Sequence, residues 1–143
     1  MSPGEVLASE TREWLVRARG DLDACAALMA AELPREALFH TQQCAEKAMK
    51  ALLTWHQIPF QKTHDLDELK QACLPLSGAD AAHLTGIERL SEYAWRFRYP
   101  GAPYSPGREE AEEAHLMASR VLEAVAVQLK CQFGDGKNEG DHQ

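Results

Sequence analysis

The sequence predicts an all-α protein, an up-and-down four-helix bundle with one additional short helix, which makes five helices. Three observations lead to this prediction. Apolar residues recur every three or four positions over four long stretches, as on the buried face of a helix. Short segments with proline or glycine separate most of these stretches, so that consecutive helices pack against each other. No stretch shows the alternation of apolar and polar residues that is typical of a half-buried strand.

The composition is that of one ordinary globular domain. The chain has 143 residues, 45% of them hydrophobic, which is enough for a single core. No apolar run is long enough to cross a membrane, and the amino-terminal residues lack the apolar segment of a signal peptide, so we expect a cytoplasmic protein. The net charge of −7 argues against a surface that binds nucleic acid generally, although a small basic pocket is compatible with it.

The first helix is expected over residues 9–33, after a flexible leader at 1–8. Pro34 separates it from the next helix, and the short connection predicts antiparallel packing. Its predicted buried positions are Leu15, Ala18, Leu22, Cys25 and Met29.

The second helix is expected from Glu36 to His56, with its end near Gln57 because Pro59 disfavours helical geometry in the residue before it. Its predicted apolar face contains Leu38, Ala45, Ala48 or Met49, Leu52 and Trp55. A polar stripe on the same helix contains His40, Gln43, Lys47 and Lys50.

A short third helix is expected to open at residues 62–66, with Asp65 in a capping position, and to end between Cys73 and Pro75. A fourth helix is expected over residues 81–97, before a loop rich in proline and glycine. Its predicted inward positions are Leu84, Ile87, Leu90, Ala94 and Phe97.

The last helix is expected over residues 108–132, because acidic residues favour a helix amino terminus. Its predicted buried positions are Ala111, Ala114, Ala118, Val121, Val125 and Leu129. The polar, glycine-rich residues 134–143 predict a disordered tail.

Three motifs in this order resemble those of the HEPN family (higher eukaryotes and prokaryotes nucleotide-binding domain). They are QQCAEKAMKALL at 42–53, KTHDL at 62–66 and RYPG at 98–101. The resemblance covers roughly residues 8–130 and implies a helical bundle domain over residues 9–133. It also implies a protein that is often dimeric and often encoded beside a minimal nucleotidyltransferase. Members of the family include metal-independent ribonucleases, toxin–antitoxin components and non-catalytic binding modules.

Polar residues from these motifs are candidates for a nucleotide- or phosphate-binding site. Lys47 and Lys50 share one face of a helix, and arginine offers a fork of donors that matches phosphate oxygens. The alternative is that both lysines are solvated and that Glu46 pairs with Lys50. The candidate residues are Gln43, Lys47, Lys50, His64, Arg98 and Tyr99.

His64 could act as a general acid or base, because its unperturbed pKa lies near neutrality. The alternative, which we favour, is that Thr63 or Asp65 caps the following helix and His64 makes one structural hydrogen bond.

Many ribonucleases of the family carry an arginine followed, after four to six residues, by a histidine. Arg108 and His115 have this spacing, and they are the catalytic candidates that the sequence offers. The residues between them are EEAEEA, and such acids would repel RNA, which argues against this pair. The sequence therefore favours a protein without catalytic activity over an enzyme.

His40 and Cys44 lie four apart on one helix face, which is a workable spacing for two metal ligands. No third ligand stands at a motif spacing, and the four scattered cysteines form no CxxC pair, so a buried Cys44 is favoured and no metal or cofactor is expected.

Trp95, Tyr99 and Tyr104 could stack on a base, but a dimer or partner interface is the favoured interpretation.

Taken together, we expect a nucleotide- or phosphate-binding homodimer that acts with a minimal nucleotidyltransferase in a toxin–antitoxin-like system. The alternatives are a metal-independent endoribonuclease toxin and a non-catalytic protein-interaction module.

Overall fold

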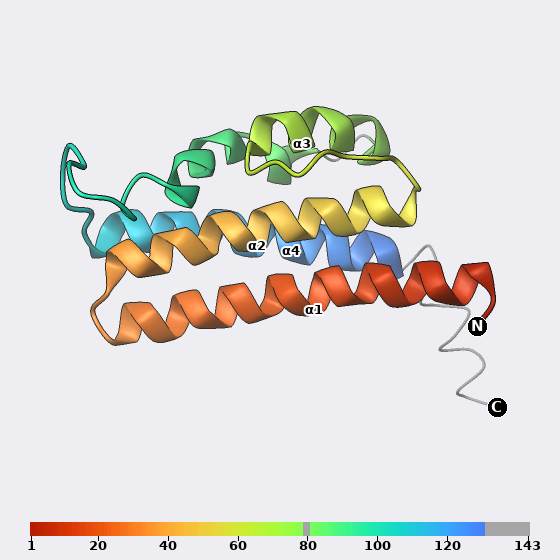
Figure 1. Cartoon of the computed structure of the whole chain (residues 1–143), viewed down its shortest axis with the longest axis horizontal. Coiled ribbons are helices and arrows are strands. Elements are labelled where there is room, and N and C mark those ends of the chain that lie inside the picture. Colours follow the sequence, from red (N-terminus) through yellow and green to blue (C-terminus); the bar gives the residue numbers. More distant parts are fainter. Residues whose placement is uncertain (79–80, 131–143) are drawn as a thin grey trace.

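The computed structural model describes residues 1–78 and 81–130, and this part of the chain is all-helical, without a β-strand (Figure 1). Within these two ranges four α-helices and three short 3-10 helices follow one another, and none of them is long and apolar enough to span a membrane. In order they are α1 (Pro3–Ala30), α2 (Pro34–Trp55), α3 (Leu66–Cys73), η1 (Leu74–Leu76), η2 (Ala82–Leu84), η3 (Ile87–Ala94) and α4 (Arg108–Leu129).

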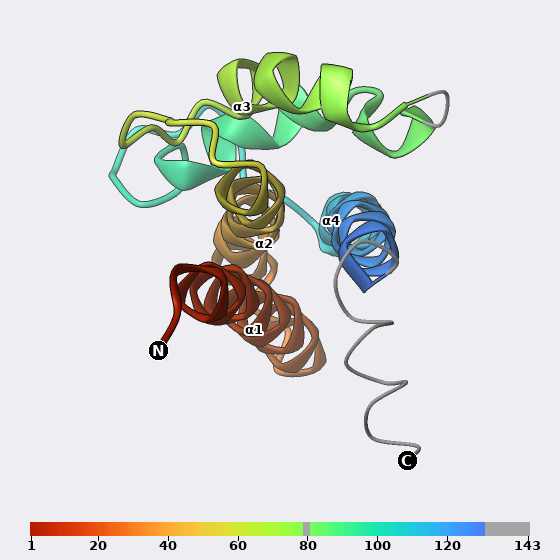
Figure 2. The ribbon, with the colours of Figure 1, turned by 90° about the vertical axis from the view of Figure 1, so that its right-hand side faces the viewer.

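Helices α2, α3 and α4 run in one direction, while α1 and the segment from η2 to η3 run in the opposite direction (Figure 1). The view along the bundle places α2 in the centre, between α1, α4 and the layer formed by α3 and the 3-10 helices (Figure 2). Thirteen of the 22 residues of α2 are buried, so its polar side chains must find partners inside the protein.

The predicted apolar faces are confirmed. The predicted positions of α4 are all buried, and those of α1 and α2 are buried or half-buried. Asp65 caps α3 as expected, because its side chain accepts a hydrogen bond from the backbone N–H of Asp67. The predicted tail at 134–143 and the last expected helical residues, 131–132, lie outside the described residues.

Helix α1 begins at Pro3, so residues 3–8 form its first turns instead of the expected flexible leader. The side chain of Ser2 accepts a hydrogen bond from the Glu5 N–H, and the Glu5 side chain accepts one from the Ser2 N–H. This reciprocal cap satisfies two backbone donors at the start of the helix, and proline is favourable at the first position.

The segment expected to be one helix over 81–97 is divided into η2 and η3. Gly86 separates them, with a φ angle of +76° that glycine adopts without steric cost. The predicted inward residues are nevertheless buried. Several of them are spaced by three, which fits the three residues per turn of a 3-10 helix.

Candidate anion-binding site

The two lysines of the predicted stripe are neutralised by acids inside the protein. Lys47 lies on α2, and its Nζ is 2.6 Å from Oδ2 of Asp21 on α1. Lys50 lies one turn further along, and its Nζ is 3.0 Å from Oε2 of Glu46. The pairing of Glu46 with Lys50, which was the alternative to a phosphate site, is therefore observed.

Glu46 is buried and joins three parts of the structure. Its carboxylate accepts hydrogen bonds from Gln42 Nε2 (3.0 Å) and Lys50 Nζ, and its Oε1 lies 2.7 Å from His64 Nδ1. Burial by itself would raise the pKa of Glu46, but the hydrogen bonds with His64, Gln42 and Lys50 outweigh it and lower that pKa. Gln42 also donates to the His64 carbonyl, and Gln43 donates to Gln42, so the stripe and the 57–65 connection form one network.

Aromatic rings enclose Lys50. Its Nζ lies 5.5 Å from the ring centroid of Trp14 on α1 and 5.6 Å from that of Phe60. Its side chain is 9% exposed. Lys50 therefore stabilises the junction of α1, α2 and the connection to α3, and an anion in solvent has no direct path to it.

His64 connects the segment before α3 to the central helix α2. Thr63 accepts a hydrogen bond from the Asp65 N–H, and His64 lies against Glu46 while its side chain remains 68% exposed. The connection between α2 and α3 is thus attached to the central helix through one histidine.

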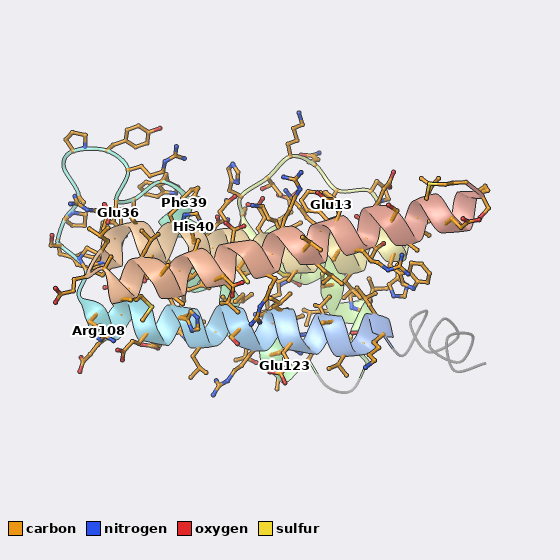
Figure 3. All side chains as sticks on the ribbon, turned by 90° about the horizontal axis from the view of Figure 1, so that it is seen from below. Glu13, Glu36, Phe39, His40, Arg108 and Glu123 are labelled. Carbon is orange, nitrogen blue, oxygen red and sulfur yellow. The ribbon has the colours of Figure 1, made fainter. Side chains whose placement is uncertain are left out.

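Arg98 lies at the other end of the stripe, against α2. Its guanidinium carbon is 5.1 Å from the ring centroid of Phe39, and the guanidinium forms no ion pair with an acidic side chain of residues 1–78 or 81–130. Figure 3 shows Phe39 and His40 side by side on α2, at the end where the loop before α4 passes. A cavity of about 360 Å³ opens here. It is lined by Arg35, Glu36, Phe39, His40, Tyr93, Phe97 and Arg98.

Asp21 orients His40 in this cavity. Its Oδ1 lies 2.8 Å from His40 Nδ1, while its Oδ2 binds Lys47. The histidine is 29% exposed, and its Nε2 has no hydrogen-bond partner within the described part of the chain. Sequence reasoning placed His40 on the stripe but did not connect it to Arg98, because 58 positions separate them and α2 meets the loop only in the folded protein.

The structure does not join Arg108 to His115. The Arg108 Nε is 2.7 Å from a carboxylate oxygen of Glu112, and Arg108 is exposed at the start of α4. Between the two residues, Glu110 accepts hydrogen bonds from the hydroxyl groups of Tyr93 and Tyr104. Burial and this contact with Glu110 raise the pKa of Tyr93, so its hydroxyl stays protonated and donates.

The predicted aromatic cluster is exposed close to Arg98. The exposed fractions are 59% for Trp95, 66% for Tyr99 and 42% for Tyr104. The ring of Tyr104 lies 5.7 Å from the guanidinium carbon of Arg96. Tyr99 therefore stands in solvent beside the residue that faces the cavity.

His40 and Cys44, which have a workable spacing for metal ligands, lie in two different environments. Cys44 is buried, its thiol lies 3.9 Å from the Ala118 carbonyl, and burial raises its pKa to about 12. His40 instead contacts Asp21. Among residues 1–78 and 81–130 no group of three or more His, Cys, Asp or Glu side chains is arranged to hold a metal ion.

Comparison with known proteins agrees with the motifs. The family model described as HEPN domain matches residues 11–129. A Methanocaldococcus jannaschii protein with the name "Putative toxin MJ1304" is 28% identical over 135 residues, which cover 85% of this chain and 89% of that protein.

Two solved structures share the fold. The archaeal HEPN homologue ST0689 is 28% identical, with a TM-score of 0.66 over 84% of this chain and 98% of the other. TT1696 from Thermus thermophilus is also 28% identical, with a TM-score of 0.70 over 81% of this chain and 95% of the other.

Proposed function

The chain belongs to the HEPN domain family, and from this premise we propose that it is a toxin-like HEPN protein that binds a phosphate group of a nucleotide or an RNA in the cavity between Arg98 and His40. The name of the Methanocaldococcus relative supports the toxin-like part of this proposal. The geometry of the cavity supports the binding part.

One observation carries the site. Arg98 presents a guanidinium that is held by an aromatic ring and is not neutralised by an acid of the described residues. Its five N–H donors match phosphate oxygens, and Arg35 adds a second cation, which Glu36 contacts only at 3.8 Å. His40 lies beside them with Nε2 available as a further hydrogen-bonding group.

The other candidate residues from the sequence have different roles around the proposed site. Tyr99 is exposed next to Arg98, where it can stack on a base. Gln43 and Lys47 extend the polar surface along α2, while Lys50 and His64 support it through Glu46. We further propose that the protein acts in the cytoplasm with a minimal nucleotidyltransferase in a toxin–antitoxin-like system.

Titration calorimetry with ATP and with a short RNA tests the site. We expect Arg98→Ala to weaken binding at least tenfold, because the bidentate donors are lost, and we expect wild-type binding to weaken as salt rises. The control is Arg108→Ala, which removes another exposed arginine, one that already pairs with an acid at i+4. Equal binding by wild type and Arg98→Ala would reject the site.

Co-expression with a neighbouring nucleotidyltransferase tests the partnership. We expect the two proteins to co-purify and the partner to relieve any growth arrest that this chain causes. Separate elution of the two proteins in size-exclusion chromatography would contradict the partnership but would leave the proposal of a phosphate site unaffected.

A metal-independent endoribonuclease is a second candidate, and the contact of Asp21 with His40 favours it. With Nδ1–H donated to the carboxylate, Nε2 can accept the proton of a ribose 2′-hydroxyl. The 2′ oxygen would then attack the neighbouring phosphorus, and the bond to the 5′ oxygen would break. The leaving oxygen takes a proton from solvent, and Arg98 stabilises the charge on the phosphate.

RNA cleavage assays in EDTA test this candidate. We expect His40→Ala to abolish cleavage and Asp21→Asn to reduce it at least tenfold, while His115→Ala leaves it unchanged. Full activity in His40→Ala, or loss of activity in folded His115→Ala, would reject His40 as the base.

A further inference from the structure

The carboxylate of Glu110 holds two tyrosines that stand near opposite ends of the loop before α4. Its Oε2 accepts hydrogen bonds from the hydroxyl groups of Tyr93 (2.5 Å) and Tyr104 (2.7 Å). Tyr93 belongs to η3, whereas Tyr104 lies in the exposed loop. Glu110 itself lies in the first turn of α4, where a negative charge is favourable. One side chain therefore ties the 95–107 segment to α4 near both of its ends.

Phe97 joins the two tyrosine rings into one cluster. Its ring stacks on that of Tyr93, with the centroids 6.0 Å apart and an interplanar angle of 22°. It also meets the ring of Tyr104 edge-on, with the centroids 5.4 Å apart and an angle of 84°. Aromatic pairs in these arrangements stabilise beyond the area that they bury. The ring contacts and the hydrogen bonds to Glu110 thus close a cycle of four side chains.

This cycle forms one wall of the cavity that contains Arg98. Tyr93 and Phe97 line the cavity of about 360 Å³, and Phe97 directly precedes Arg98 in the chain. Glu110 lines a separate hollow of about 120 Å³, which it shares with Tyr93. Glu110 is therefore not among the residues that face the proposed phosphate, and it acts on them through Tyr93, Phe97 and the loop.

Arg98 depends on this wall for its direction. Its guanidinium carbon lies 5.1 Å from the ring centroid of Phe39 on α2, while its backbone follows Phe97 into the exposed loop. Figure 3 shows Arg108, where α4 begins, at the same end of the bundle as Phe39. An arginine on a loop that is not held must be ordered when an anion binds, and this ordering costs conformational entropy.

We propose that Glu110 is a positioning residue for the phosphate site, because it ties both ends of the loop to α4 and so fixes Arg98 against the cavity. The inference rests on the proposed function of Arg98. Its sign distinguishes it from an effect of charge. An acid near an anion site repels the anion, so removal of the charge alone should strengthen binding. Removal of a positioning residue should weaken binding, because the loop must then be ordered by the ligand.

Titration calorimetry with ATP tests this sign. We expect Glu110→Ala to weaken ATP binding about fivefold or more. Glu110→Gln should bind ATP within about twofold of wild type, because its amide oxygen can still accept both hydroxyl hydrogen bonds. The control is Glu113→Ala, which removes an exposed acid three positions further along the same helix and should leave binding unchanged or slightly stronger. In an Arg98→Ala background, Glu110→Ala should have almost no further effect, since it acts through Arg98.

Limited proteolysis gives a readout that does not depend on ATP. Trypsin cleaves after arginine, and the bond between Arg98 and Tyr99 lies in the tied loop. We expect Glu110→Ala to be cut there about threefold faster or more, because a loop must leave its place to enter the protease. Tyr104→Phe keeps the ring and loses only a hydroxyl of an exposed residue, so it tests the same tie with little effect on the core. It should also be cut faster than wild type.

Two results would overturn the proposal. The first is unchanged or tighter ATP binding by Glu110→Ala that circular dichroism shows to be folded. The second is equal cleavage by trypsin of wild type, Glu110→Ala and Tyr104→Phe. Equal ATP binding by wild type and Arg98→Ala would instead reject the phosphate site itself, and trypsin would then show separately whether Glu110 holds the loop.

Discussion

At the scale of single residues, the decisive feature is that charges on α2 are compensated by partners from other elements. Asp21 binds His40 and Lys47, and Glu46 binds Lys50 and His64. Two carboxylates thus meet two lysines and two histidines in the centre of the protein, although the whole chain carries a net charge of −7. Arg98 differs because an aromatic ring, and not a carboxylate, holds it.

Removal of the Glu46 carboxylate should destabilise the protein. In Glu46→Ala the buried Lys50 loses its counter-ion, and a buried charge left unpaired costs about 3 kcal/mol or more. Urea denaturation measures the free energy of unfolding. The control is Glu46→Leu combined with Lys50→Met, which should recover much of the lost stability because both charges are removed together. A Glu46→Ala variant as stable as wild type would contradict the expectation.

Glu46 should also make stability depend on acid pH. Its pKa is lowered in the folded protein relative to the ordinary value of 4.5, so its contribution is fully present above pH 4.5 and is lost as the pH falls through the lower folded value. We expect the difference in unfolding free energy between wild type and Glu46→Gln to shrink below that pH. A difference that grows on acidification would have the opposite sign and would refute this account.

At the scale of elements, glycine decides where the chain departs from regular helix. Residues 81–97 have apolar positions that fit either an α-helix or a 3-10 helix, and the sequence pattern alone could not separate them. Gly86 adopts a φ of +76° between η2 and η3, whereas Gly20 lies inside α1 without any interruption. The same residue type therefore marks a break in one place and is tolerated in the other.

These two glycines should respond oppositely to alanine. Gly86→Ala should destabilise by about 1 kcal/mol or more, because the backbone angle disfavours a side chain and the new Cβ would stand 2.9 Å from the Arg89 guanidinium. Gly20→Ala should stabilise by about 0.5–1 kcal/mol, since no atom lies within 4 Å of its Cβ and alanine favours a helix. Thermal unfolding of both variants measures this, and two shifts of the same sign would be inconsistent with the structure.

At the scale of the whole molecule, α2 is the element on which the others pack. It contacts α1, α3, α4 and η3, and it also contributes one wall of the candidate site through Phe39 and His40. The bundle thus fixes the position of His40 more firmly than that of Arg98, which follows η3 and begins the loop before α4.

Hydrogen exchange should reveal that α2 is held more firmly than the loop between η3 and α4. Backbone amides in the middle of α2 should exchange only through global unfolding, because no residue from Thr41 to Leu53 is exposed. Amides of residues 95–107 should exchange much faster, since this segment is largely exposed and lacks α-helical hydrogen bonds. Comparable protection of the two segments would contradict the central role of α2.

The sequence by itself determined the all-helical class, the buried faces of the long helices, the capped start of α3 and the family motifs. These features are local, because helical periodicity and capping depend on residues within a few positions of each other. Tertiary structure decided which charged side chains pair with an oppositely charged group inside the protein and which do not. Asp21 meets His40 across 19 positions, Glu46 meets His64 across 18, and Phe39 meets Arg98 across 59. Such contacts depend on how helices pack, and a pattern with a period of 3.6 residues describes a face of one helix without identifying the residues that cover it.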